Sequence, residues 1–188
     1  PIIAQDNTYD MLLDGKFGEL TQLQNDVIKN LKISNNDLKN LITDLLDAHK
    51  LETCDFELNK EKTDLNELIK EVIEQNKAVL SVKNKEIVYS GSKIECTIDS
   101  YLIKRVLNNL ISNAIFYGKS SKYIYIELFK KSSTVEISVT DEGDGIHDDI
   151  NLIFKKYYSA SKKYSNIGIG LGLYIVSKII NAHKGTIT

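Results

Sequence analysis

The first 54 residues place apolar side chains at steps of three, four and seven, which is the spacing of amphipathic helices. The same stretch has few turn formers apart from the two glycines of DGKFGEL. The pattern predicts a first helix that ends near Asp14, a short loop, and a second helix from about Thr21 to Glu52. The only proline, Pro1, stands where a helix tolerates it, in the first turn.

One face of the second expected helix stays apolar along its length. Leu31, Leu38 and Leu45 keep a single heptad position apolar, which is typical of a helical hairpin or bundle. Because one hairpin buries only one side of each helix, we expect residues 1–54 to form half of a dimeric four-helix bundle with a second copy. The alternative is that the hairpin packs on the remainder of this chain.

The hydrophobic pattern changes after a polar connection at residues 55–62. From residue 63 to 188, helical periods and strand-like alternation follow each other, which predicts an α+β domain. The expected elements are, in chain order, a helix over about 64–80, strands KEIVYS and KIECTID, a helix capped by Asp99 or Ser100 that runs to 118, a hairpin of YIYIELF and TVEISVT, a helical turn near 148–154, a helix over about 171–184, and a final strand GTIT.

Composition limits the classes of function. A chain of 188 residues with 42% apolar residues can bury a core in one domain or two small ones. Its net charge of −2 gives no field that would draw it to nucleic acid or anionic lipid. Cys54 and Cys96 stand in no metal-like or redox-like pattern, which favours reduced thiols and a cytoplasmic location. No apolar run approaches the roughly 20 residues of a membrane span, although an anchor in a longer protein stays open.

The stretch NNLISNA, on the helix expected after Asp99, holds the first candidate site residues. Asn109 and Asn113 are four positions apart and so share one helix face. Because asparagine is a poor helix former, two of them in an apolar run suggest a polar task on one side of the helix. A carboxamide oxygen suits a hard cation such as Mg²⁺. The alternative is a pair of solvent-facing asparagines.

Two glycine-containing stretches follow. In TDEGDGI, directly after an expected strand, Asp141, Gly143 and Gly145 let the backbone approach a flat ligand while the carboxylate binds an amine or a cation. An acidic β-turn is the alternative for this stretch. In NIGIGLGLYIV, three glycines lead into a helix whose free N–H groups and dipole favour a phosphate. No lysine follows them as in a P-loop, and their place late in the chain does not suit a dinucleotide fingerprint.

The order of these stretches resembles the ATP-binding domain of sensor histidine kinases. Asn109…Asn113, Asp141-x-Gly143-x-Gly145, IFKKYY and Gly168-x-Gly170-x-Gly172 are similar to that family's N, G1, F and G2 boxes. LLDAHKLE at 45–52 looks like the end of the family's second dimerisation helix, and NAHKGTI resembles its H-G-G-x-I segment. The resemblance implies an α/β sandwich of the gyrase and histidine-kinase superfamily for residues 63–188.

The resemblance also implies a site for ATP and Mg²⁺. Asp141 would accept a hydrogen bond from the adenine amine, and Asn113 would supply an oxygen to Mg²⁺. Asn109 and Asn113 would be the catalytic pair, and the late glycines would fold over the phosphates. The implied ATP-binding residues are Asn109, Asn113, Tyr117, Asp141, Gly143, Gly145, Ile146, Lys156, Tyr157, Gly168, Gly170, Leu171 and Gly172.

Asn109 separates the histidine kinases from their relatives. Gyrase, chaperone and mismatch-repair ATPases and the related serine kinases carry glutamate at the matching place, where it acts as a base. A carboxamide cannot remove a proton from water or from a hydroxyl group. A neutral imidazole nitrogen needs no such base, so Asn109 favours phosphorylation of a histidine over hydrolysis.

The sequence departs from the family pattern near the expected phosphates. Phe116 stands where the family often has Lys or Arg, and the F box reads FKKYY rather than Phe-Glu-Pro-Phe-Tyr. Our hypothesis is that a nearby lysine replaces the missing cation, and the alternative is that these lysines are solvated. The candidates are Lys155, Lys156, Lys162 and Lys163. Lys184 replaces the first glycine after His183, without an expected consequence.

In the family, the phosphate-accepting histidine lies in a run of the form His-Glu/Asp-x-x-Thr-Pro-Leu. PIIAQ looks like the continuation of that run, which would place the acceptor about five residues before Pro1. The chain would likewise stop before the family's last strand pair. His49, His147 and His183 lack the pattern and are not expected to accept phosphate.

The expected protein is thus a homodimeric kinase core that phosphorylates a histidine and passes the phosphate to an aspartate of a response-regulator receiver domain, with no nucleic-acid partner. Two alternatives stay open. One is a degenerate ATP-binding scaffold that only dimerises or docks a partner. The other is an ATP-hydrolysing enzyme of the same superfamily.

Overall fold

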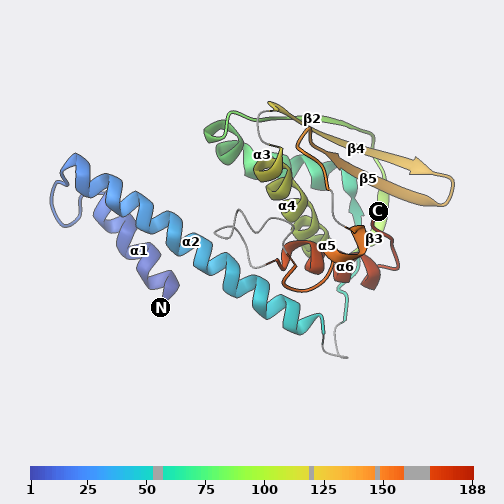
Figure 1. Cartoon of the computed structure of the whole chain (residues 1–188), viewed down its shortest axis with the longest axis horizontal. Coiled ribbons are helices and arrows are strands. Elements are labelled where there is room, and N and C mark those ends of the chain that lie inside the picture. The colour runs from blue at the N-terminus through green and yellow to red at the C-terminus, as the bar shows by residue number, and fades with distance from the viewer. Residues whose placement is uncertain (53–56, 119–120, 147–148, 159–169) are drawn as a thin grey trace. The chain divides into compact units, whose positions relative to one another are not determined.

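The computed structural model (Figure 1) describes five stretches of the chain: residues 1–52, 57–118, 121–146, 149–158 and 170–188. The chain divides into two compact units, Pro1–Lys50 and Leu51–Thr188. Among the described helices, none is both long and apolar enough to cross a membrane.

The first unit is the predicted helical hairpin. Helices α1 (Ile2–Leu13) and α2 (Gln22–Lys50) lie side by side (Figure 1). Thr21 begins α2 with a reciprocal cap, because its N–H donates to Gln24 Oε1 at 2.9 Å while Gln24 N–H donates to Thr21 Oγ1 at 3.3 Å. Asn35 Nδ2 donates to the carbonyl of the first residue of α1 at 3.1 Å, which helps to fix the register of the two helices.

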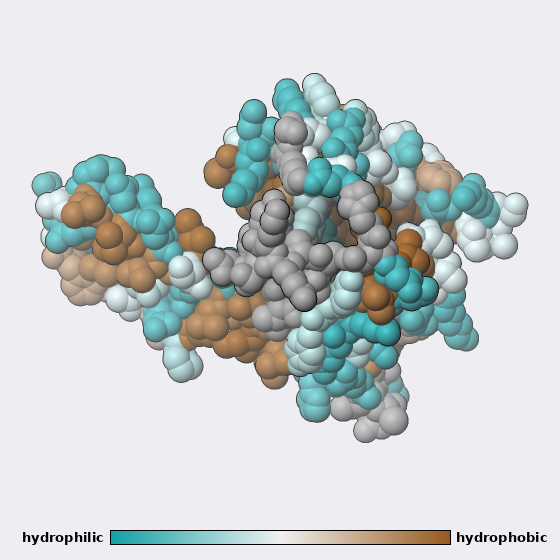
Figure 2. Space-filling model, viewed as in Figure 1, coloured by the Kyte–Doolittle hydropathy of each residue, from teal (hydrophilic) through white to brown (hydrophobic). Residues whose placement is uncertain are grey.

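The apolar seam of α2 is largely uncovered in the single chain. Leu31, Leu38 and Leu45 are 47%, 46% and 47% exposed, whereas Ile28 is buried. Figure 2 shows hydrophobic side chains gathered on the visible face of the hairpin. The hairpin alone therefore leaves this seam available to a partner helix.

The second unit is built on a three-stranded sheet with the order β2-β4-β5. Its strands are β2 (Glu86–Gly91), β4 (Tyr123–Lys131) and β5 (Thr134–Thr140). Strand β2 is parallel to β4, and β4 and β5 form the antiparallel hairpin that their alternation predicts.

Alternate residues of β4 determine which face of the sheet is buried. Ile124 and Ile126 are fully buried, whereas the tyrosines that alternate with them are exposed. Helices α3 (Leu65–Val82) and α4 (Ser100–Tyr117) contact the sheet, and α4 packs between α3 and α6 (Gly172–Ala182) (Figure 1). This arrangement of helices on a sheet confirms the predicted α+β fold class.

The start of α4 is fixed by the buried carboxylate of Asp99, as the sequence predicts. Its Oδ1 accepts the N–H of Leu102 at 3.1 Å, and its Oδ2 accepts the N–H of Asn59 at 3.0 Å. A fixed first turn sets the orientation of every later residue of α4, including both candidate asparagines.

The structure differs from the sequence prediction at two strands. β1 (Glu61–Asp64) pairs antiparallel with β3 (Glu95–Ile98) in a second, two-stranded sheet. The sequence of β1, EKTD, has no apolar alternation, so it resembles the polar connection before it. The prediction of a final strand at GTIT is wrong, because residues 185–188 pair with none of the described strands.

Candidate nucleotide site

One face of α4 carries three of the predicted site residues. Asn109, Asn113 and Tyr117 follow each other at four-residue steps, so they lie one above the other on this face. Both asparagines are half-buried, and neither carboxamide has a hydrogen bond to any described residue. Two half-buried amides without protein partners are suited to a polar ligand, because burying an unpaired polar group is costly.

The first turn of α6 lies against the N-terminal end of this face. A Cβ atom on Gly172 would come within 3.3 Å of Asn109 Oδ1, so glycine allows the close approach. Leu171, just before it, is buried and anchors the start of α6. The free N–H groups of this turn give the site a partial positive charge beside Asn109.

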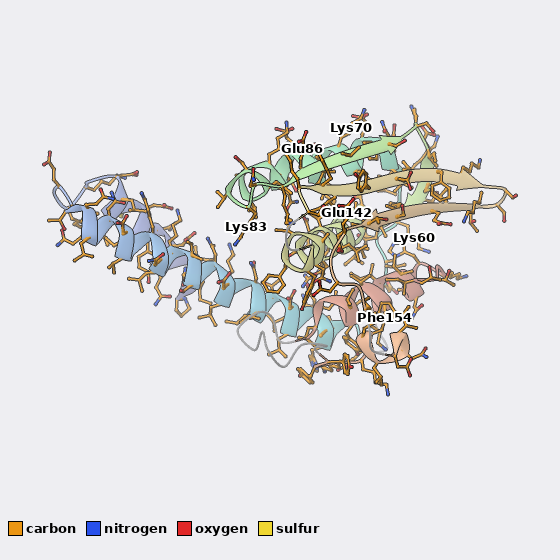
Figure 3. All side chains as sticks on the ribbon, turned by 45° about the horizontal axis from the view of Figure 1, so that its top comes forward. Lys60, Lys70, Lys83, Glu86, Glu142 and Phe154 are labelled. Carbon is orange, nitrogen blue, oxygen red and sulfur yellow. The ribbon has the colours of Figure 1, made fainter. Side chains whose placement is uncertain are left out.

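The loop after β5 lies against the C-terminal end of the same face. A Cβ atom on Gly143 would lie 2.4 Å from the carbonyl oxygen of Tyr117, which leaves no room for a side chain. Asp141 Oδ1 accepts the N–H of Gly143 at 2.8 Å and holds this turn. Glu142, labelled in Figure 3, accepts a hydrogen bond from Ser121 Oγ at 2.8 Å and ties the loop to the chain before β4.

Two further predicted residues of this loop are open to solvent. Gly145 has a φ of +73° and has no other atom within 4 Å of an added Cβ, and Ile146 is 58% exposed. The positive φ turns the loop outward after Gly143 and leaves this part of the site open for a ligand.

The segment after α5 (Ile150–Ile153) approaches the residue that precedes α6. Tyr157 N–H donates to the carbonyl of Gly170 at 3.1 Å. Gly170 has a φ of +70°, and a Cβ atom there would lie 2.6 Å from the carbonyl oxygen of Tyr158. Phe154, labelled in Figure 3, ends α5. The described parts of IFKKYY and of the late glycine stretch are therefore in direct backbone contact.

Lys156 is paired with Glu52, which the sequence analysis names as the expected end of the second helix but not as a site residue. Its Nζ donates to both oxygens of Glu52, at 2.9 and 3.1 Å, and this bond raises the pKa of Lys156. Tyr174 Oη donates to Glu52 Oε1 at 2.7 Å. Burial of the phenol, and then its bond to Glu52, raises the pKa of Tyr174 to about 12. Glu52 is 104 residues from Lys156, and only its place in LLDAHKLE pointed to it in the sequence.

Several of the predicted residues that the structure describes meet in three contacts. They are Asn109 with Gly172, Gly143 with both Tyr117 and Asp141, and Tyr157 with Gly170. Asn113 lies one turn from both Asn109 and Tyr117. Gly168, Lys162, Lys163 and His147 lie outside the described residues. In the described part of the chain, no three His, Cys, Asp or Glu side chains gather to hold a metal ion.

The chain is similar in sequence and in fold to known proteins. Residues 98–188 match the family described as Histidine kinase-, DNA gyrase B-, and HSP90-like ATPase. Over 151 residues, the chain is 33% identical to the adaptive-response sensory kinase SasA of Synechocystis, which covers 78% of this chain and 39% of that kinase. The fold matches that of the histidine kinase AdeS of Acinetobacter baumannii with a TM-score of 0.72 and 25% identity, over 100% of this chain and 87% of that one. The chain belongs to the sensor histidine kinases.

The chain is also 29% identical over 159 residues to the sensor-like histidine kinase SenX3 of Mycobacterium tuberculosis, and this match covers 82% of the chain. The chain spans 39% of the length of both SasA and SenX3. The comparisons confirm the resemblance, the fold class and a histidine-kinase-type ATPase module. The role of each site residue of this chain in nucleotide binding or catalysis remains a prediction.

Proposed function

We propose that the chain is a histidine kinase catalytic core that binds Mg-ATP and transfers the γ-phosphoryl group to a histidine. The observation that carries this proposal is the face of α4 with Asn109 and Asn113, bounded by the first turn of α6 at one end and by the loop of Asp141 and Gly143 at the other. The match of residues 98–188 to an ATPase family supports ATP as the ligand.

The adenine binds at the loop end of this face. Asp141 Oδ1 is occupied by the N–H of Gly143, and among the described residues no donor bonds its second oxygen, Oδ2. Oδ2 accepts a hydrogen bond from the exocyclic amine of the base. The open space beside Gly145 admits the flat ring, and Tyr117, 40% exposed, borders it.

The phosphates bind at the α6 end. The free N–H groups and the dipole of the first turn of α6 favour negative charge there, beside Gly170 and Gly172. The Asn113 carboxamide oxygen is suited to Mg²⁺, whose other ligands would be phosphate oxygens and water, in keeping with a site without a carboxylate cluster among the described residues. When bound, Mg²⁺ neutralises the charge that develops as the γ-phosphoryl group leaves.

The acceptor is a histidine rather than water. Asn109, which touches the first turn of α6, can orient a ligand through hydrogen bonds but cannot remove a proton. An imidazole nitrogen attacks with its own lone pair and needs no base at this place. We propose that this histidine lies outside the 188 residues, because His49, His147 and His183 all lack the expected flanking pattern.

The hairpin supplies the dimer. The half-exposed seam of Leu31, Leu38 and Leu45 packs against the same seam of a second copy and completes a four-helix bundle. The phosphorylated histidine then passes its phosphate to an aspartate of a response-regulator receiver domain.

Isothermal titration of the 188-residue chain with Mg-ATP tests the binding step. A chain extended upstream to include its natural histidine, incubated with γ-labelled ATP, tests the transfer step. The proposal expects saturable binding by the chain and an acid-labile, base-stable label on the extended chain. No heat of binding contradicts the proposal, and free phosphate without label points to hydrolysis.

One observation favours the second candidate, an ATP-binding scaffold without kinase activity. Phe116 packs edge-on against Tyr117, with ring centroids 4.9 Å apart, where the family often has a cation. Lys156, a possible replacement for that cation, is engaged by Glu52. Binding of Mg-ATP by the extended chain without any transfer would favour the scaffold.

A further inference from the structure

Glu52 accepts hydrogen bonds from two side chains of the second unit, Lys156 and Tyr174, which lie 104 and 122 residues later in the chain. Its carboxylate receives Lys156 Nζ at 2.9 and 3.1 Å and Tyr174 Oη at 2.7 Å. Tyr174 is buried, with 9% of its surface exposed, and the side chains of Lys156 and Glu52 are 30% and 38% exposed. A charge pair that is partly shielded and shares a buried hydroxyl donor is stronger than a fully exposed pair.

Each donor leads to a residue of the nucleotide site. Lys156 precedes Tyr157, whose N–H bonds the carbonyl of Gly170 at 3.1 Å. Tyr174 lies two residues after Gly172, which makes the close approach to Asn109 Oδ1. Glu52 therefore contacts both the stretch whose Tyr157 bonds Gly170 and the helix that begins at Gly172.

Tyr157 adds a reason why this stretch needs support. It is not glycine, yet it has a φ of +64°, a backbone conformation that costs a bulky residue free energy. Lys156 Nζ also lies 5.4 Å from the centroid of the Tyr157 ring, a cation–π contact. The ion pair with Glu52 and the ring contact together hold Lys156 and its strained neighbour in place.

We propose that Glu52 is a positioning residue of the nucleotide site, which through Lys156 and Tyr174 holds the Gly170 and Gly172 backbone at the distance from Asn109 that the phosphates require. The proposal rests on the proposed function. Because Glu52 stands two residues after the last residue of α2, the contact gives the segment that follows the hairpin a direct effect on nucleotide affinity.

The test is isothermal titration of the full chain with Mg-ATP, comparing wild type with Glu52→Gln, Glu52→Asp and the control Glu57→Gln, which changes an exposed carboxylate of the same connecting segment. Neighbouring residues that interact couple by about 1 kcal/mol, so Glu52→Gln should weaken Mg-ATP binding about fivefold. Glu57→Gln should leave binding unchanged.

The Asp variant separates positioning by charge from simple packing. Aspartate keeps the charge but is one methylene shorter, whereas glutamine keeps the shape and loses the charge. The proposal expects Glu52→Asp to bind more tightly than Glu52→Gln, and the opposite order overturns it. Lys156→Met should weaken binding to a similar degree and add little to Glu52→Gln in the double variant, because the two changes remove one interaction.

Wild type that fails to bind Mg-ATP contradicts the proposed function itself. If wild type binds Mg-ATP, and both Glu52→Gln and Lys156→Met bind it within twofold of wild type or more tightly, the positioning role alone is overturned. Circular dichroism of each variant confirms the fold. If Glu52→Gln does not fold, the Mg-ATP affinity of Lys156→Met alone decides whether the positioning role holds.

Discussion

The backbone N–H of Asp99 donates a hydrogen bond to Nε2 of His183 at 3.0 Å, across 84 residues of sequence. Nδ1 of the same ring lies 2.8 Å from the carbonyl of Ile179, so the proton of a neutral ring belongs on Nδ1 and Nε2 accepts. Asp99 caps α4, and His183 ends α6. The bond therefore ties the start of α4 to the end of α6, the two helices that meet where Asn109 lies close to Gly172.

Substitution of His183 tests this tie. In His183→Ala the N–H of Asp99, a buried residue, loses its acceptor, which should lower the free energy of unfolding of the second unit by about 1–3 kcal/mol. Urea denaturation measures the change. Asn181→Ala, on an exposed position of the same helix, should stay within about 0.5 kcal/mol of wild type. Equal stability of both variants would show that the Asp99–His183 bond contributes nothing.

Much of this fold could be predicted because its signals are local. The heptad of Leu31, Leu38 and Leu45 indicates the hairpin, and an aspartate before an apolar run predicts the cap of α4 at Asp99. The missed strand β1 shows the opposite case. Its four polar residues have no pattern of their own and become a strand because β3 offers a partner.

The site, too, has residues that the sequence could predict and contacts that it could not. Asn109, Asp141 and the glycines lie in short motifs with a recognisable spacing, and the structure brings Gly143 and Gly172 against α4. The bonds of Glu52 to Lys156 and Tyr174 join residues more than 100 positions apart, so only the folded chain reveals them. The left-handed backbone angle at Lys184 was missed for a different reason: the family's glycine at this position was the only sign of it, and its replacement by lysine was expected to have no consequence.

Lys184 occupies a position that favours glycine. Its φ is +61°, and α6 ends there with hydrogen bonds from Lys184 N–H to Asn181 O and from Gly185 N–H to Ile180 O, both at 2.9 Å. This is the paired bonding of a Schellman cap, whose left-handed residue is usually glycine. Lys184→Gly should raise the free energy of unfolding by about 0.5–1 kcal/mol, since relief of the left-handed strain exceeds the added chain entropy of glycine.

The matched control for Lys184→Gly is Lys83→Gly at the end of α3, labelled in Figure 3, where the backbone has an ordinary φ of −87°. There glycine relieves no strain and should destabilise the protein by up to about 1 kcal/mol. Thermal unfolding of both variants measures the two changes. A loss of stability in both would show that the lysine at 184 is not strained.

Gly143 tests whether the loop after β5 must touch α4. A Cβ atom there would lie 2.4 Å from Tyr117 O, a backbone atom that cannot turn aside, so Gly143→Ala should push the loop from the helix. We expect Mg-ATP affinity to fall by about tenfold or more, because the Asp141 carboxylate moves with the loop. Gly145→Ala meets no atom within 4 Å and adds only the strain of its φ of +73°, so it should weaken binding less. The reverse order of affinities in titration would contradict the contact.

Asp141 tests base recognition. Loss of a hydrogen bond to a charged acceptor is worth about 1.5–3 kcal/mol, so Asp141→Ala should weaken ATP binding about 10- to 100-fold. Asp141→Asn is the sharper variant, because its oxygen can still accept the N–H of Gly143 while its NH₂ group faces the base amine, donor to donor. Isothermal titration should show weak ATP binding by both variants. Normal binding by Asp141→Asn would assign the carboxylate to holding the loop only.

Alkaline pH tests the bond between Tyr174 and Glu52. Burial and the bond raise the folded pKa of Tyr174 to about 12, above its unfolded value of about 10. The protonated phenol therefore stabilises the fold fully below pH 10, and this contribution, about 2 kcal/mol, is lost as the pH rises from about 10 to 12. Lysines also lose protons in this window, so the measured quantity is the difference in unfolding free energy between wild type and Tyr174→Phe. That difference should shrink by about 2 kcal/mol across the window, whereas a constant difference would show that the phenol ionises alike in the folded and unfolded chain.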